Sequence, residues 1–144
     1  MEYVFAAKLT VDRDGGLLVT FPDVPDAITH GADHAEARRN AAEALGMALR
    51  GYLADGEPLP CPAAKGKKGL VDIPVEASDA LKIAVIEAFQ AAGISKAEFA
   101  RRLGKAVTEA QRILDPDHPT KLAALTDALS VLGKEVVVSV KDAA

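Results

Sequence analysis

The sequence of 144 residues has one cysteine, no tryptophan and only six aromatic side chains, four Phe and two Tyr. The lone cysteine, Cys61, excludes a disulfide within the chain and favours a reducing compartment. No apolar run approaches the ~20 residues of a membrane span, and no basic segment leads into an apolar one near Met1. We therefore expect a cytoplasmic protein that does not enter a membrane.

The shortage of aromatic side chains also limits the core. Hydrophobic residues make up 49% of the chain, but many of them are Ala. Domains of about 60 to 75 residues are marginally stable alone and often gain stability by association. We expect a homodimer or a higher homo-oligomer.

Charge is unevenly distributed along the chain. The net charge of −4 argues by itself against nucleic-acid binding. Residues 1–62 carry ten acids and five bases, whereas residues 94–121 carry six bases and four acids. Either the two halves have different partners, or the difference is the random variation that small domains show.

The first half predicts strands followed by a helix. Apolar residues at every odd position from Tyr3 to Val11 predict a strand with one buried face. Asp12–Gly16 predicts a hairpin turn into a strand over Leu17–Phe21, which Pro22 ends. Ala27–His30 predicts a short third strand.

Asp33 is then predicted to cap a helix, with Glu36 completing a variant of the capping box and Gly56 ending the helix. Its apolar positions at helical spacing are Ala37, Ala41, Leu45, Ala48, Leu49, Tyr52 and Leu53. A Pro- and Lys-containing linker over about 57–69 precedes an edge strand over Leu70–Val75. Residues 1–76 thus form a predicted βββαβ domain, one curled sheet with one helix on its face.

The first half shows little sign of a catalytic or metal-binding site. Its carboxylates lie scattered over turns, and no pair is spaced as a general acid and base. His30 and His34 lie on either side of the strand-to-helix turn and share no helical face. The run Lys65–Lys68 fits phosphate contacts or a solvated linker. We expect no catalytic residue, no metal and no cofactor.

The second half, residues 77–144, predicts helices. Ser78 is predicted to cap a helix that Gly93 ends, and Ser95 with Glu98 to cap the next. The apolar stripe of the first of these helices is Leu81, Val85, Ala88, Phe89 and Ala92. Thr120 is predicted to start a further helix that Gly133 ends, with Leu122, Leu125, Leu129 and Leu132 inward. Glu135–Val140 predicts a possible terminal strand.

The stretch Ile94–Leu114 has the pattern of a helix-turn-helix. Ala100 is small enough for two helices to cross closely, and Gly104 supplies the positive φ that the turn needs. The shared core is predicted to be Phe99, Leu103, Ala110 and Ile113. A plain helical hairpin used for assembly is the alternative. Ala106 at the start of the second helix is a poor cap.

In a helix-turn-helix the second helix lies in the major groove. Its predicted outward side chains, candidates for reading base edges, are Val107, Thr108, Gln111 and Arg112. Candidates for holding phosphates are Lys96, Lys105, His118 and Lys121. Alternatively, Arg112 only pairs with Glu109 or Asp115 of its own segment.

Two sets of motifs, in order, resemble the HicB antitoxins. The first set is Asp12–Gly16, Leu17–Pro25, the capped helix and Asp55–Pro60. The second set resembles the helix-turn-helix version of that family and comprises Gly104–Ala106, Arg112–Lys121 and Leu132–Gly133. The sequence departs from the family at Asp26–Ala27, where members often carry Gly-Cys.

The resemblance implies an α+β protein whose N-terminal domain is a degenerate ribonuclease-H-like fold without catalytic carboxylates. That domain would bind and block HicA, a small basic toxin that cleaves mRNA, and the C-terminal domain would bind operator DNA and repress the operon. The acidic first half suits a basic ribonuclease. Asp23, Asp26 and Asp33 are candidate toxin contacts, and the alternative for each is a turn former or helix cap.

Two other functions stay open at this point. A ribonuclease-H-like domain could itself cleave RNA, although metal-dependent cleavage needs converging carboxylates that the sequence does not indicate. The chain could also be a transcription factor whose first domain senses a small molecule.

Overall fold

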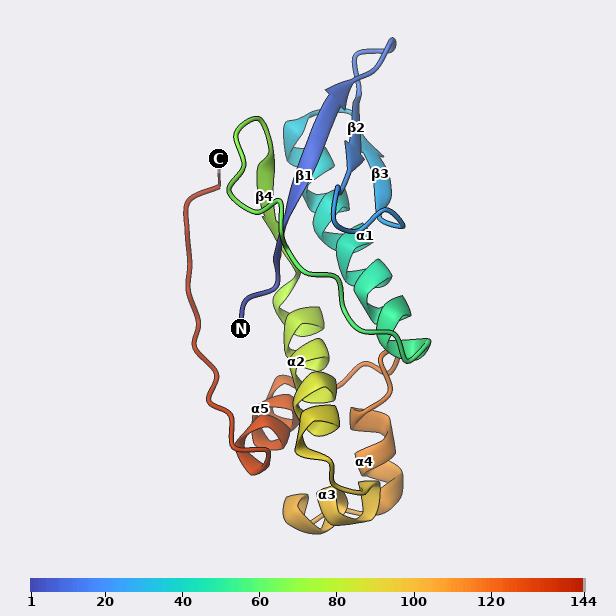
Figure 1. Cartoon of the computed structure of the whole chain (residues 1–144), viewed down its shortest axis with the longest axis vertical. Helices are drawn as coiled ribbons and strands as arrows, with labels where there is room; N and C mark the ends of the chain where they lie inside the picture. The colour runs from blue at the N-terminus through green and yellow to red at the C-terminus, as the bar shows by residue number, and fades with distance from the viewer. Residues whose placement is uncertain (144) are drawn as a thin grey trace. The chain divides into compact units, whose positions relative to one another are not determined.

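The computed structural model describes residues 1–143, which divide into two compact units with the boundary between Ala77 and Ser78. The first unit is a four-stranded antiparallel sheet with one helix, in the strand order β3-β2-β1-β4 (Figure 1). Its elements are β1 (Val4–Val11), β2 (Leu17–Thr20), β3 (Ile28–Gly31), α1 (His34–Ala54) and β4 (Val71–Pro74). The predicted βββαβ order and the α+β class are confirmed.

The β1–β2 hairpin forms as predicted. The Asp12 carboxylate accepts hydrogen bonds from the backbone N–H groups of Asp14 and Gly16, at 2.9 and 3.0 Å. Gly15 takes the positive φ of 84° that the turn needs. The prediction of one continuous buried face fails at Val11, which is 69% exposed. β4 pairs only with Val4–Ala7, so the far end of β1 has a neighbouring strand on one side only.

Helix α1 begins and ends as predicted. The Asp33 side chain accepts from the N–H of Glu36 at 2.8 Å, and the Glu36 carboxylate accepts from the N–H of Ala32 at 2.6 Å. The buried side of α1 comprises Ala37, Ala41, Leu45, Gly46, Leu49 and Leu53, whereas the predicted Ala48 and Tyr52 are only half-buried. At its start α1 lies so close to β3 that a Cβ on Gly31 would overlap the backbone of Ala37.

The segment between α1 and β4, expected as a linker, is held within the first unit. The Asp23 carboxylate accepts from the N–H of Ala64 at 2.7 Å, and Ala64 itself is buried. Lys65 forms an ion pair with Glu2 at 2.5 Å, and the Asp72 carboxylate accepts from the N–H of Gly66 at 3.0 Å. This segment is therefore part of the packed unit.

The second unit is helical, apart from its connections and tail. Its elements are α2 (Ala77–Ala92), α3 (Lys96–Leu103), α4 (Val107–Ile113) and α5 (Leu122–Val131). Gly93 and Gly133 follow α2 and α5 with φ of 64° and 77°, as their predicted role as helix stops requires. The predicted cap at Ser78 is wrong, because α2 already begins at Ala77, and Ala92 at its last turn is exposed rather than buried.

Two predictions fail in the last part of the chain. Helix α5 begins at Leu122 rather than Thr120, because the Thr120 hydroxyl bonds elsewhere, and Leu122 in the first turn is exposed. Glu135–Val140 is not a strand: no described strand lies paired with it, and a strand needs a partner for its backbone groups. Val137, Val138 and Val140 are among its exposed side chains.

Candidate functional site

Two arginines of helix α3 form ion pairs with a glutamate of the same helix. The Ser95 hydroxyl caps its start by accepting from the N–H of Glu98 at 3.0 Å. The Glu98 carboxylate accepts two hydrogen bonds from Arg101, at 2.6 and 2.8 Å, and one from Arg102 at 3.0 Å. These guanidinium groups lower the pKa of Glu98 to about 2. Arg101 and Arg102 therefore have a partner on their own helix.

A short turn at Gly104 sets the direction from α3 to α4. Gly104 takes the left-handed conformation with φ 67°, and its N–H donates to the carbonyl of Arg101 at 3.1 Å. The N–H of Lys105 donates to the carbonyl of Ala100 at 3.0 Å. Ala106 at the start of α4 makes no side-chain cap, as its sequence predicts. Hydrogen bonds to carbonyls of α3, and not a side-chain cap on α4, therefore hold the turn.

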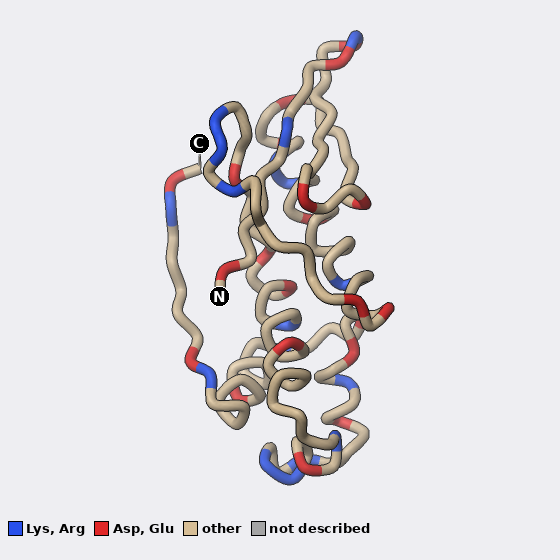
Figure 2. Tube along the Cα trace, viewed as in Figure 1, with Lys and Arg blue, Asp and Glu red and all other residues tan. Residues whose placement is uncertain are grey.

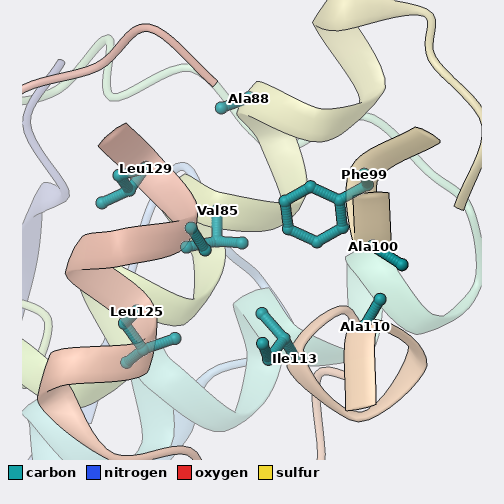
Figure 3. Close-up of a cluster of buried hydrophobic side chains, with 9 residues drawn as sticks. Val85, Ala88, Phe99, Ala100, Ala110, Ile113, Leu125 and Leu129 are labelled. Carbon is teal, nitrogen blue, oxygen red and sulfur yellow. The ribbon is translucent and has the colours of Figure 1, made fainter. Parts of the chain in front are cut away.

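A shared apolar core fixes which side of α4 faces outward. The buried side chains come from all four helices of the second unit (Figure 3). They are Val85, Ala88, Phe99, Ala100, Ala110, Ile113, Leu125, Ala128 and Leu129. Phe99 lies against Phe89 with ring centroids 5.4 Å apart, and the predicted core residue Leu103 is only half-buried at the margin. Small residues at 100 and 110 let α3 and α4 approach closely.

The opposite side of α4 is exposed. It presents the four side chains predicted to face outward, Val107, Thr108, Gln111 and Arg112. Unlike Arg101 and Arg102, Arg112 makes no ion pair with any described residue, so the alternative pairing with Glu109 or Asp115 does not form. Lys and Arg positions gather along α3 and the turn after it, where Lys96 and Lys105 are both exposed (Figure 2).

His118 and Lys121 lie on the segment between α4 and α5, and both are exposed. The structure therefore brings four of the eight candidates together on one short helix, places Lys105 just before it, and leaves Lys96, His118 and Lys121 on neighbouring segments. The carbonyl of His118 accepts a bond from the Thr120 hydroxyl at 3.3 Å, so the segment has internal order.

A buried lysine, which the sequence reasoning missed, supports the C-terminal end of α4. The Lys82 side chain on α2 is 4% exposed. Its ammonium donates to the carbonyls of Arg112 and Ile113 at 3.2 and 2.9 Å and to the Thr120 hydroxyl at 2.6 Å. Burial lowers the pKa of Lys82 to about 8, and the nearby Asp115 opposes that shift. A lysine in an apolar stripe is the only sequence signal that could have indicated it.

The three aspartates predicted to contact a partner have different surroundings. Asp23 holds the segment at Ala64, and Asp33 caps α1, so both have structural roles. Asp26 is exposed and lies near Tyr52. Burial raises the pKa of the Tyr52 phenol, and the charge of Asp26 adds to that shift. Of these three side chains, Asp26 is exposed to solvent and accepts no hydrogen bond from a described backbone N–H group.

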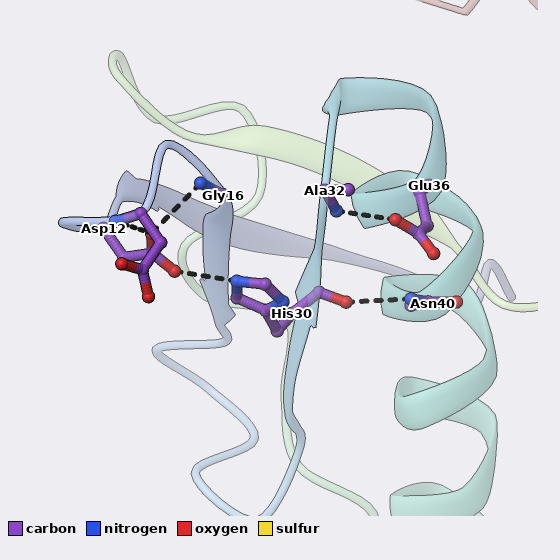
Figure 4. Close-up of polar contacts among 7 residues, drawn as sticks. Asp12, Gly16, His30, Ala32, Glu36 and Asn40 are labelled. Atoms are coloured by element: carbon purple, nitrogen blue, oxygen red, sulfur yellow. Dashed lines mark hydrogen bonds and ion pairs between the residues drawn. The ribbon is translucent and has the colours of Figure 1, made fainter.

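A further polar contact links the hairpin to β3. The Asp12 carboxylate lies 2.7 Å from Nε2 of His30, and this contact lowers the pKa of Asp12 (Figure 4). The His30 ring lies directly over Gly16, where any Cβ would meet it. In the described part of the chain no three His, Cys, Asp or Glu side chains gather as metal ligands. None of the described helices has the length and apolar character needed to cross a bilayer.

Comparison with known proteins gives a consistent result. The family model described as "HicB_like antitoxin of bacterial toxin-antitoxin system" matches residues 4–84. The chain is 35% identical over 133 residues to antitoxin HicB of Escherichia coli (strain K12), an alignment that covers 92% of this chain and 95% of the relative. It is 38% identical over 121 residues to antitoxin HicB 2 of Photorhabdus laumondii, covering 84% of this chain and 85% of that relative.

Proposed function

The chain belongs to the HicB-like family of antitoxins of bacterial toxin–antitoxin systems, and we propose a division of labour between its two units. The first unit binds and blocks a HicA-type toxin that cleaves mRNA. The second unit binds operator DNA through a helix-turn-helix made of α3 and α4, and so represses transcription of its own operon.

The family match and the charge of the first unit support its role as the toxin-binding part. The matched residues 4–84 cover the whole sheet and α1. Residues 1–77 carry twelve acids and eight bases. An acidic module accelerates association with a basic ribonuclease and opposes phosphate binding at its own surface.

The observation that carries the DNA-binding proposal is the exposed side of α4. Thr108, Gln111 and Arg112 lie on one solvent-facing side, and Arg112 has no ion-pair partner among the described residues. The core around Phe99 and Ile113 fixes that side in place. A guanidinium can offer a bidentate fork to guanine, and a glutamine amide can pair with adenine. Lys96, Lys105, His118 and Lys121 would hold phosphates around this helix.

We further propose that the second unit associates as a homodimer or higher homo-oligomer. The exposed tail at Val136–Val140 supports this, because an unpaired β-branched segment is a site for strand pairing with another copy. Light scattering at micromolar concentration tests it: a dimer or larger species is expected, and a monomer would contradict it.

The function is tested by co-expressing the chain with the toxin encoded in the same operon, followed by growth assay and size-exclusion chromatography. Growth is expected to recover and the two proteins to co-elute. Gel-shift assays with the operator and with random DNA of equal length then test the second unit. Persistent growth arrest with well-folded chain, or equal affinity for both DNAs, would contradict the respective half of the proposal.

A further inference from the structure

The C-terminal end of α4 is held by a buried ammonium group of α2. The hydrogen bonds of Lys82 to the carbonyls of Arg112 and Ile113 and to the Thr120 hydroxyl use all the donors of an ammonium group. Ile113 is the last residue of α4, and the last carbonyls of a helix lack their usual partners within it. Lys82 therefore joins α2, the end of α4 and the segment before α5.

Helix α4 depends on such contacts for its position. It has seven residues, and Ala106 at its start makes no side-chain cap. A helix this short is not stable alone, so contacts with the rest of the unit must hold it. Ala110 and Ile113 belong to the shared apolar core and determine which side of α4 faces inward (Figure 3). Apolar contacts are non-directional, whereas hydrogen bonds depend on distance and angle, so Lys82 constrains the helix end more narrowly.

The groups that Lys82 holds belong to residues proposed to contact DNA, or adjoin them. The carbonyl at 3.2 Å is that of Arg112, whose exposed side chain is proposed to read a base. Thr120 precedes Lys121, and its hydroxyl also donates to the carbonyl of His118 at 3.3 Å. A bidentate contact with guanine requires the guanidinium to meet two acceptors at once. A displaced backbone at this point would move the Arg112 side chain away from that geometry.

The charge of Lys82 is costly for the core of the second unit. Its neighbours Ile83, Val85 and Ile86 on α2 are buried. Burying an ammonium among apolar side chains costs hydration free energy, and the lowered pKa of Lys82 reflects that cost. Replacing buried charges by apolar side chains is often neutral or stabilising. The bonds to the end of α4 give the ammonium a role that an apolar side chain could not fill.

We propose that Lys82 is a positioning residue for operator recognition, which holds the Arg112 carbonyl and the Thr120 hydroxyl so that the Arg112 side chain meets a base edge. This rests on the proposed function, in which α4 reads the operator. Lys82 is buried and does not itself contact DNA. The proposed phosphate contacts Lys96 and Lys105 lie on α3 and the turn after it, away from these bonds. Loss of the ammonium should therefore reduce the preference for the operator more than it reduces binding to DNA of any sequence.

The test measures dissociation constants of the full-length chain for the operator and for random DNA of equal length, by fluorescence anisotropy well below the melting temperature. Lys82→Met keeps an unbranched side chain and removes the ammonium. The random-to-operator ratio of dissociation constants is expected to fall about tenfold, the discrimination that one bidentate contact provides. The matched control Lys134→Met removes an exposed lysine of the same unit and should keep the parent ratio. A purely structural role would change the free energy of unfolding and leave this ratio unchanged in folded chain.

Two substitutions at Thr120 decide the matter if Lys82→Met does not fold. Thr120→Val removes the hydroxyl and keeps a similar shape, and the ratio should fall about threefold because two of the three bonds remain. Thr120→Ser keeps the hydroxyl and should bind both DNAs like the parent.

A parent-like ratio in folded Lys82→Met would overturn the positioning role. If that variant does not fold, a parent-like ratio in Thr120→Val, or an equal loss in Thr120→Ser, would overturn it. A parent chain that does not prefer the operator to random DNA would instead overturn the proposed function of the second unit.

Discussion

The two units use their charged side chains in different ways. In the first unit, two of the three acids predicted to contact a partner accept hydrogen bonds from backbone N–H groups, Asp23 from Ala64 and Asp33 from Glu36. In the second unit, two arginines of α3 are bound by Glu98, while Arg112 on α4 is exposed without an ion pair among the described residues. The charge balance of a segment therefore does not say which of its charged side chains are available to a partner, and the hydrogen-bond network does.

The largest effect is expected from the core of the second unit. Phe99→Ala removes a fully buried ring and should lower the free energy of unfolding by about 3–5 kcal/mol. Operator binding should be lost, whereas toxin neutralisation, which we propose for the first unit, should remain. Denaturant unfolding and the growth assay check this. Loss of both activities would show that the units do not act separately.

Lys82 makes the stability of the second unit depend on pH. Its folded-state pKa of about 8 lies below the ordinary 10.5, so unfolding takes up a proton between these values. The free energy of unfolding should therefore rise with pH from about 8 to 10.5, by up to about 3 kcal/mol. The control is Lys82→Met, which lacks this group. Parallel pH profiles of parent and control would contradict the assignment.

Two glycines near α1 should respond in opposite directions to the same change. Gly31→Ala should destabilise the first unit by about 2 kcal/mol, because its Cβ would overlap the Ala37 backbone. Gly51→Ala meets no neighbouring atom within 4 Å and should stabilise α1 by about 0.5–1 kcal/mol. Thermal melts of both variants provide the measurement. The same sign for both would refute the close approach of α1 to β3.

Within the second unit, substitutions at Arg112 and Lys105 should distinguish a contact that reads a base from a contact that binds phosphate. Arg112→Ala should cost about 1–3 kcal/mol on the operator and relax the preference at one base pair. Lys105→Ala should weaken operator and random DNA alike and reduce the salt slope by about one unit. Gel shifts at several salt concentrations distinguish them. Equal losses on both DNAs for Arg112→Ala would make it a phosphate contact.

Local signals could be predicted from the sequence, and distant contacts could not. The Asp12–Gly16 turn, the Asp33 and Ser95 caps and the Gly104 turn each depend on residues within about four positions, which the sequence displays directly. Lys82 bonds residues 30 to 38 positions away, and Asp23 bonds a residue 41 positions away. Such partners depend on how helices and loops pack. The predicted strand at Glu135–Val140 failed for a related reason, since its side-chain pattern does not say whether a partner strand exists.

The division of labour is tested most directly by one variant measured against both partners. The double variant Gln111→Ala, Arg112→Ala removes two exposed side chains of α4 and leaves the core contacts of Ala110 and Ile113 in place. The account predicts that operator affinity falls at least about tenfold while the dissociation constant for the toxin stays within about twofold of the parent. Unchanged operator affinity, or a parallel loss of toxin binding, would contradict it.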